Sequence, residues 1–143
     1  MSDPKLPLTG GCMCGGVRFE VSEPLPGALY CHCKRCQRRT GTGFSVTALA
    51  NPGSYRTVSG EDLVRLWAPP DGGWVKAFCG ECGSQLFTHD PENPDMVGVR
   101  MGALDEDPGI RPSVHQFTPF AASWAPVPDD GLPRFPRRLT DAR

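Results

Sequence analysis

The sequence contains no long run of hydrophobic residues. No segment of its 143 residues approaches the roughly 18 consecutive apolar side chains that a membrane-spanning helix requires. The opening residues, MSDPKLPLTGG, have no basic region followed by an apolar segment, which is the pattern of a secretory signal. These two absences predict a protein without a membrane partner that resides in the cytoplasm.

An excess of charge of one sign is also absent. The formal net charge is −1, and such a balance disfavours a general nucleic-acid-binding surface. The charges are distributed unevenly, because residues 1–70 carry 8 basic and 5 acidic side chains whereas residues 71–143 carry 7 and 11. We therefore expect no nucleic-acid partner, and we note that the basic excess lies in the half with the densest cysteine cluster.

The apolar periodicity of long helices is missing as well. No window keeps a helical apolar stripe over three turns, and 16 prolines and 17 glycines punctuate the chain. Residues 34–39 alone have the character of a helical turn, which would bring Cys33 and Cys36 to one side. Short segments with the character of strands are found instead at residues 16–21, 43–48, 63–67, 75–78 and 96–101.

We predict one mainly β domain with little helix over residues 1–143. A hydrophobic content of 38% can fill a modest core, although something besides packing is needed to stabilise it. Residues 126–143 contain four prolines and seven charged side chains, so we expect them to form a Pro-rich tail packed on this domain.

Cysteine is abundant in this chain. Seven cysteines cannot all pair, and a reducing cytoplasm disfavours disulfides. Their spacing forms three compact groups, Cys12-x-Cys14, Cys31-x-Cys33-x-x-Cys36 and Cys79-x-x-Cys82. Each group can direct two or more thiolates at one ion, for which zinc is the first choice and iron the second. The alternative, that these cysteines are merely small buried side chains, does not explain paired spacing three times over.

Two of the groups are expected to share a structural zinc. The glycines in GGCMCGG (residues 10–16) and CGECG (residues 79–83) let backbone amides approach the sulfurs, as in zinc knuckles. A closed four-thiolate site of this kind would contribute directly to folding. Its ligands would be Cys12, Cys14, Cys79 and Cys82.

The remaining group, Cys31, Cys33 and Cys36, would give zinc three ligands and leave the fourth position open. The alternative is a closed site completed by His32, His89 or His115. Against His32, a side chain between two ligands in an extended segment points to the side opposite them. We expect the open site, and therefore two zinc ions per chain.

An open three-thiolate zinc suits thiol chemistry better than hydrolysis. The three sulfurs donate much electron density, so a bound water is acidified little, whereas a thiol can bind as a fourth ligand and become a thiolate. The added negative charge needs nearby cations. Lys34, Arg35, Arg38 and Arg39 are placed to supply them, and Arg35, Arg38 and Arg39 can bind the carboxylates of a glutathione-like substrate.

These residues resemble a known family, the glutathione-dependent formaldehyde-activating enzyme and centromere protein V family. The resemblance rests on GGCMCG (10–15), CHCKRC (31–36) and FCGECGSQLF (78–87). Near the end of the chain it is supported by Pro112, His115, Trp124 and LPRFP (132–136).

The resemblance implies a fold of coiled β-sheets with zinc-ribbon-like knuckles. It also implies that Cys31, Cys33 and Cys36 hold a catalytic zinc and that the other four cysteines hold a structural one. The implied activity is that of a carbon–sulfur lyase, similar to S-(hydroxymethyl)glutathione synthase, which reversibly adds glutathione or another small thiol to formaldehyde or a related aldehyde through a zinc-bound thiolate. For His115 a structural role is expected, with proton donation or the support of a zinc ligand as the alternatives; Trp124 is expected to be a core or lid aromatic, with a substrate platform as the alternative.

Two other functions are compatible with the same cysteines. A non-catalytic zinc-binding interaction module would use residues 34–39 as its contact surface, although this run lacks the interleaved aromatic side chains of nucleic-acid-binding surfaces. A redox sensor would release zinc when Cys31, Cys33 and Cys36 are oxidised. The oligomeric state and the proton donor cannot be read from the sequence.

Overall fold

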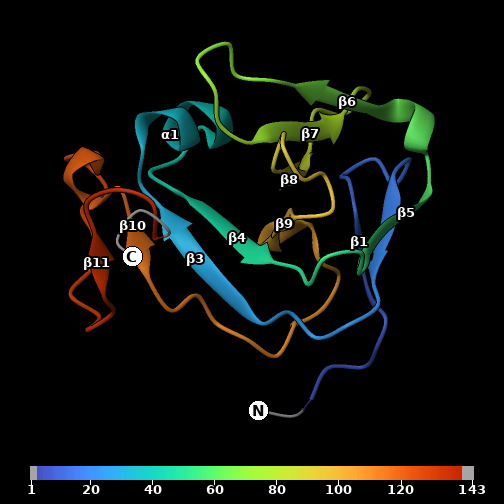
Figure 1. Cartoon of the computed structure of the whole chain (residues 1–143), viewed down its shortest axis with the longest axis horizontal. Helices are drawn as coiled ribbons and strands as arrows, with labels where there is room; N and C mark the ends of the chain where they lie inside the picture. The colour runs from blue at the N-terminus through green and yellow to red at the C-terminus, as the bar shows by residue number, and fades with distance from the viewer. Residues whose placement is uncertain (1–2, 140–143) are drawn as a thin grey trace. The chain divides into compact units, whose positions relative to one another are not determined.

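The computed structural model of the chain describes residues 3–139. Strands occupy 34% and helices 12% of it, which confirms the mainly β prediction. Two compact units are distinguished by backbone packing (Figure 1). The first contains Ala48–Ile110 and the described residues up to Pro26; the second contains Gly27–Thr47 and the described residues from Arg111 onward. Within residues 3–139, no helix has the length and apolarity needed to cross a membrane.

A three-stranded antiparallel sheet belongs to the first unit. Its order is β1 (Leu8–Gly11), β2 (Arg18–Val21) and β5 (Tyr55–Ser59). The predicted alternation in β2 is confirmed, because Phe19 and Val21 are buried while Arg18 and Glu20 are partly exposed. The ring of Phe19 packs on that of Tyr55 with centroids 5.1 Å apart, which joins β2 to the edge strand.

Four further strands of the first unit form an antiparallel run. They are β6 (Val64–Trp67), β7 (Val75–Cys79), β8 (Gln85–His89) and β9 (Val97–Arg100), and two 3-10 helices, η1 (Glu61–Leu63) and η2 (Met101–Ala103), flank the run. Strand β7, one of the two inner strands of this run, is buried over most of its length and ends at Cys79. The turn from β7 to β8 therefore begins at one predicted ligand and carries another, Cys82.

The second unit is built around parallel pairing of short strands. Residues His115–Gln116 (β10) pair with β3 (Gly27–Cys31) on one side and with β11 (Arg134–Phe135) on the other. Strand β4 (Ser45–Leu49) begins in this unit beside β3, and the 3-10 helix η3 (Thr118–Phe120) follows β10. The predicted tail thus contributes β11; residues 140–143 of that prediction lie outside the described residues.

Helix α1 (Lys34–Thr40) lies between β3 and β4, where a helical turn was predicted. Cys33 is its N-cap, and the sulfur accepts a hydrogen bond from the amide of Cys36 at 3.3 Å. Gly41 ends the helix with φ 69°, a conformation that favours glycine. The caps fix a seven-residue helix that begins directly after the second cysteine of the CHCKRC segment.

Candidate functional site

Four cysteines from distant parts of the first unit meet in one cluster, which we call the tetrad. Cys12 and Cys14 follow β1, whereas Cys79 ends β7 and Cys82 lies in the following turn. Their four sulfur atoms all lie within 4.8 Å of one another, with Cys12 to Cys14 at 3.5 Å and Cys14 to Cys79 at 3.9 Å. The predicted pairing of the first and last cysteine groups agrees with this geometry.

Backbone turns shape the tetrad. Gly15 and Gly83, one after each pair of cysteines, both have φ 77°, where a Cβ would be strained. In the first turn the amide of Val17 donates to the sulfur of Cys12 at 3.2 Å. The two turns are joined because the amide of Met13 donates to the hydroxyl of Ser84 at 2.9 Å.

The thiols of the tetrad differ in acidity. Hydrogen bonds from the side chain and then the backbone of Ser84 lower the pKa of Cys82 to about 5. A backbone hydrogen bond at Gly16 lowers the pKa of Cys14, but hydrogen bonding to the Cys12 thiol, burial, and hydrogen bonding to Cys82 and Cys79 together outweigh it, and the net pKa is raised to about 11. A thiolate at Cys82 therefore coexists with the Cys14 thiol, which keeps its proton until a cation replaces it.

Three cysteines of the second unit form a separate cluster, the triad. Cys31 ends β3, Cys33 caps α1 and Cys36 lies in its first turn. Their sulfurs also lie within 4.8 Å of one another. Cys31 and Cys36 are buried, and Cys33 is partly exposed. The hydroxyl of Ser45, itself buried, donates to the sulfur of Cys36 at 3.1 Å.

The donor set of the triad fits a metal ion. Hydrogen bonding to Cys33 and then to Cys36, together with burial, raises the pKa of the Cys31 thiol. Three thiols this close cannot all ionise unless a positive charge compensates them, and a divalent ion supplies that charge. Both clusters can therefore hold a metal ion.

The triad gains no histidine ligand in the part of the chain that the structure describes. The ring of His32 contacts another histidine instead of joining the cluster of sulfurs: its Nε2 is 2.8 Å from Nδ1 of His115. His89 Nδ1 lies 3.0 Å from the carbonyl oxygen of Asp90. Within residues 3–139 the triad therefore has three candidate ligands, and the open site stays a prediction.

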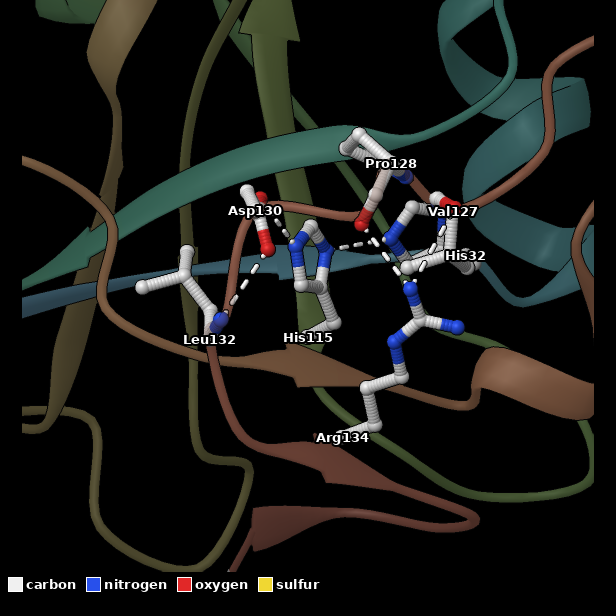
Figure 2. Close-up of polar contacts among 7 residues, drawn as sticks. All are labelled: His32, His115, Val127, Pro128, Asp130, Leu132 and Arg134. Atoms are coloured by element: carbon white, nitrogen blue, oxygen red, sulfur yellow. Dashed lines mark hydrogen bonds and ion pairs between the residues drawn. The ribbon is translucent and has the colours of Figure 1, made fainter.

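Both buried histidines belong to a hydrogen-bonded chain (Figure 2). His32 and His115 are each 1% exposed, and Nε2 of His115 lies 2.8 Å from a carboxylate oxygen of Asp130. Burial, followed by the neighbouring His115, lowers the pKa of His32. The hydrogen bond to His115, then that from the Leu132 amide, lowers the pKa of Asp130. The structural role expected for His115 agrees with these contacts.

The basic side chains of α1 differ in exposure. Lys34 and Arg38 are exposed, whereas Arg35 and Arg39 are half-buried. Of the three arginines predicted to bind substrate, Arg38 is thus the most accessible. The core alternative for Trp124 is wrong, since this side chain is 70% exposed.

Sequence reasoning missed three contributors to these sites: Ser45, Ser84 and Asp130. Ser84 belongs to the FCGECGSQLF segment but was given no role there, and Ser45 and Asp130 belong to none of the quoted motifs. Ser84 lies close to Cys82 in the sequence and could have been suspected for that reason, but Ser45 and Asp130 approach their partners only through the fold.

The model of the glutathione-dependent formaldehyde-activating enzyme family matches residues 7–119. The chain belongs to this family. The matched residues include all seven cysteines, His32 and His115, whereas Asp130 lies beyond them.

Relatives of the chain agree with this membership. A Halomonas elongata protein described as a putative glutathione-dependent formaldehyde-activating enzyme is 29% identical over 126 residues, which span 84% of this chain and 80% of that protein. The crystal structure of a Rhodobacter sphaeroides protein superposes with a TM-score of 0.59 at 25% identity, covering 90% of this chain and 99% of that one. The first comparison agrees with the family, and the second supports the fold.

Proposed function

We propose that the protein is a zinc-dependent carbon–sulfur lyase that reversibly adds a glutathione-like thiol to formaldehyde or a related aldehyde. The observation that carries this proposal is the triad, a cluster of three thiols without a fourth protein ligand in residues 3–139. The family match, which includes all three cysteines, supports the choice of substrates. We further propose that the chain is one zinc-binding domain, with its Pro-rich residues from 126 onward packed on it, and acts in the cytoplasm.

Two zinc ions per chain are proposed, because all-sulfur donor sets favour zinc in a reducing compartment. Cys12, Cys14, Cys79 and Cys82 would hold a structural ion with four ligands. A zinc ion held by Cys31, Cys33 and Cys36 would offer a fourth position at which a thiol is deprotonated and made nucleophilic.

The protein's own groups prepare this chemistry. Ser45 donates a hydrogen bond to Cys36, which stabilises negative charge on that sulfur. The partly exposed Cys33 marks the side from which a substrate would approach. Lys34 and Arg38 are exposed on the helix that Cys33 caps, so they would offset the charge of an incoming thiolate and bind its carboxylates.

The proposed reaction forms one carbon–sulfur bond. The sulfur lone pair attacks the carbonyl carbon, the π electrons of the carbonyl move to its oxygen, and this oxygen takes up the proton that the thiol released. The reverse reaction breaks the same bond and returns the aldehyde and the thiol.

The test compares exchange between free glutathione and its hydroxymethyl adduct in the presence of formaldehyde, followed by NMR, with and without the protein. We expect the wild type to accelerate exchange above the spontaneous rate. Cys33→Ser should remove the acceleration while leaving the fold intact. Equal rates with wild type, Cys33→Ser and buffer would refute the proposal for this thiol and aldehyde.

A further inference from the structure

A residue of the C-terminal segment is connected to the triad segment through two buried rings (Figure 2). Asp130 contacts His115 at 2.8 Å, and His115 contacts His32 at 2.8 Å. His32 lies between Cys31 and Cys33 in the sequence. All of these residues belong to the second unit, so the connection is internal to it.

The carboxylate sets the direction of the hydrogen bonds. An ionised carboxylate only accepts, so Nε2–H of His115 donates to Asp130. Nδ1 of the neutral His115 ring is then an acceptor, and Nε2–H of His32 donates to it. Asp130 thereby selects the tautomer of both rings, and loss of the carboxylate would remove this selection.

His32 is also held by its backbone. Its amide donates to the carbonyl oxygen of Gln116 at 3.1 Å, and its carbonyl oxygen accepts from the Gln37 side chain at 3.0 Å. Within residues 3–139 the ring's other nitrogen, Nδ1, is buried and has no hydrogen-bond partner. The contact with His115 is therefore the ring's one polar anchor in the described chain.

Rotation of His32 would displace the triad. The flanking cysteines share its backbone, and along an extended segment successive side chains point to opposite sides. A ring fixed on one side of this segment therefore fixes the directions of the Cys31 and Cys33 sulfurs on the other. Groups that orient a ligand-bearing segment in this way typically affect metal affinity.

The segment around Asp130 is itself held by hydrogen bonds. The Leu132 amide donates to the second carboxylate oxygen at 3.1 Å, and Arg134 donates to the carbonyl oxygen of Pro128 at 2.9 Å (Figure 2). Tyr30 stacks on the His115 ring with centroids 4.8 Å apart and 14° between the planes. Asp130 and His115 are thus both constrained before any metal binds.

We propose that Asp130 is a positioning residue for metal binding at the triad, acting through His115 and His32 on the Cys31–Cys33 segment. This inference rests on the proposed metal at the triad. It assigns to a residue outside the family match a part in assembling the family's site. A purely structural role would instead lower the stability of the chain without affecting one cluster more than the other.

The test measures zinc release from the zinc-loaded full-length protein during titration with a chelator, read with a zinc-sensitive dye. Cys33→Ser and Cys82→Ser assign the release steps to the triad and the tetrad. Asp130→Ala should weaken zinc binding at the triad by about 10- to 100-fold and leave the tetrad unchanged. Asp130→Asn, which keeps a neutral acceptor oxygen, should fall between wild type and Asp130→Ala. The exposed neighbour Asp129, changed to alanine, is the matched control.

Equal triad affinity in Asp130→Ala and Asp129→Ala would overturn the inference, as would equal weakening of both clusters. If Asp130→Ala fails to fold, Asp130→Asn decides in the same way. Weaker zinc binding by Asp130→Asn at the triad, with the tetrad unchanged, supports the inference; a triad affinity equal to that of Asp129→Ala overturns it. Two release steps in the wild type with no shift in the variants would contradict only the role of Asp130. A single step, assigned to the tetrad, would remove the metal at the triad and the proposed function with it.

Discussion

The tetrad and the triad present the same candidate ligand, the cysteine thiol, in two different arrangements of the chain. The tetrad joins Cys14 to Cys79 across 65 residues, whereas the triad lies within six consecutive residues. Closing a long loop restricts the unfolded chain much more than closing a short one. A metal ion at the tetrad can therefore stabilise the fold, while one at the triad adds little chain constraint and remains available for chemistry.

Their surroundings differ in the same sense. The tetrad is hydrogen-bonded by the Ser84 hydroxyl and backbone amides, and one cation, Arg18, lies near Cys12. The triad lies at the start of a helix that carries four basic side chains. Four ligands suit a closed site, and three ligands on a strongly basic helix suit an anionic substrate.

The largest effect is expected from Cys79→Ser. This fully buried residue belongs to the tetrad, and structural zinc sites in small domains contribute on the order of 10 kcal/mol to folding. We expect the variant to lose zinc and cooperative thermal unfolding, as measured by circular dichroism and elemental analysis. Cys33→Ser, its counterpart in the triad, should keep a melting temperature near that of the wild type. Equal melting temperatures for wild type and Cys79→Ser would remove the contrast.

Acid should separate the two clusters. A thiol must lose its proton to bind a metal, so protons displace the metal as the pH falls. A thiol with a higher pKa takes up its proton, and releases the metal, at a higher pH. The pKa of Cys31 in the triad is raised by its hydrogen bonds to Cys33 and Cys36. In the tetrad the pKa of Cys14 is also raised, to about 11, but hydrogen bonds from Ser84 lower that of Cys82 to about 5, and the pKa of Cys12 is lowered because its burial is outweighed by its hydrogen bonds. Zinc should therefore leave the triad first when the protein is titrated downward from about pH 8. Release from the tetrad first, in the same dye assay, would contradict this order.

A smaller effect is expected from Ser45→Ala. The variant loses the hydrogen bond to the sulfur of Cys36, and contacts of this kind are worth about tenfold in metal affinity. Zinc competition should show weaker binding at the triad, with the tetrad as internal reference. Ser84→Ala should weaken zinc binding at the tetrad and leave the triad unchanged, because the Ser84 hydroxyl contacts the sulfur of Cys82 at 3.2 Å. If each variant weakened the other cluster, the assignment of these supports would be wrong.

The smallest effect is expected from Arg38→Ala. Loss of one exposed cation should raise the KM for glutathione by about 3- to 10-fold with little change in kcat, and added salt should reduce the difference. Arg56→Ala provides a control, since Arg56 is exposed in the first unit and pairs with Glu20 at 3.4 Å. A fall in kcat at unchanged KM would argue against substrate binding by Arg38.

Local patterns explain how much of the fold the sequence predicts. The five strand-like segments correspond to β2, β4, β6, β7 and β9. Strand β1 was missed because LTGG lacks alternation, and β3 because GALYC is largely apolar. Strands β10 and β11 have two residues each, and their pairing with distant partners leaves no periodic signal.

The site follows the same rule. Cysteine spacing predicted the three groups, and the matching glycine flanks of the first and last groups predicted that these two form the tetrad. The connection from His32 to Asp130 was not predicted, because it depends on the parallel pairing of β3 with β10 and on a loop 98 residues further along the chain. Spacing reveals which atoms can share an ion, but not the groups that orient them.

The central claim, that two metal sites in one chain serve different purposes, is tested most directly by the zinc content of wild type and Cys33→Ser. Both proteins would be purified under reducing conditions without chelator, analysed for zinc per chain, and melted side by side. The account predicts two zinc ions in the wild type and one in Cys33→Ser, at nearly equal melting temperatures. One zinc in the wild type, or two in the variant, would contradict it.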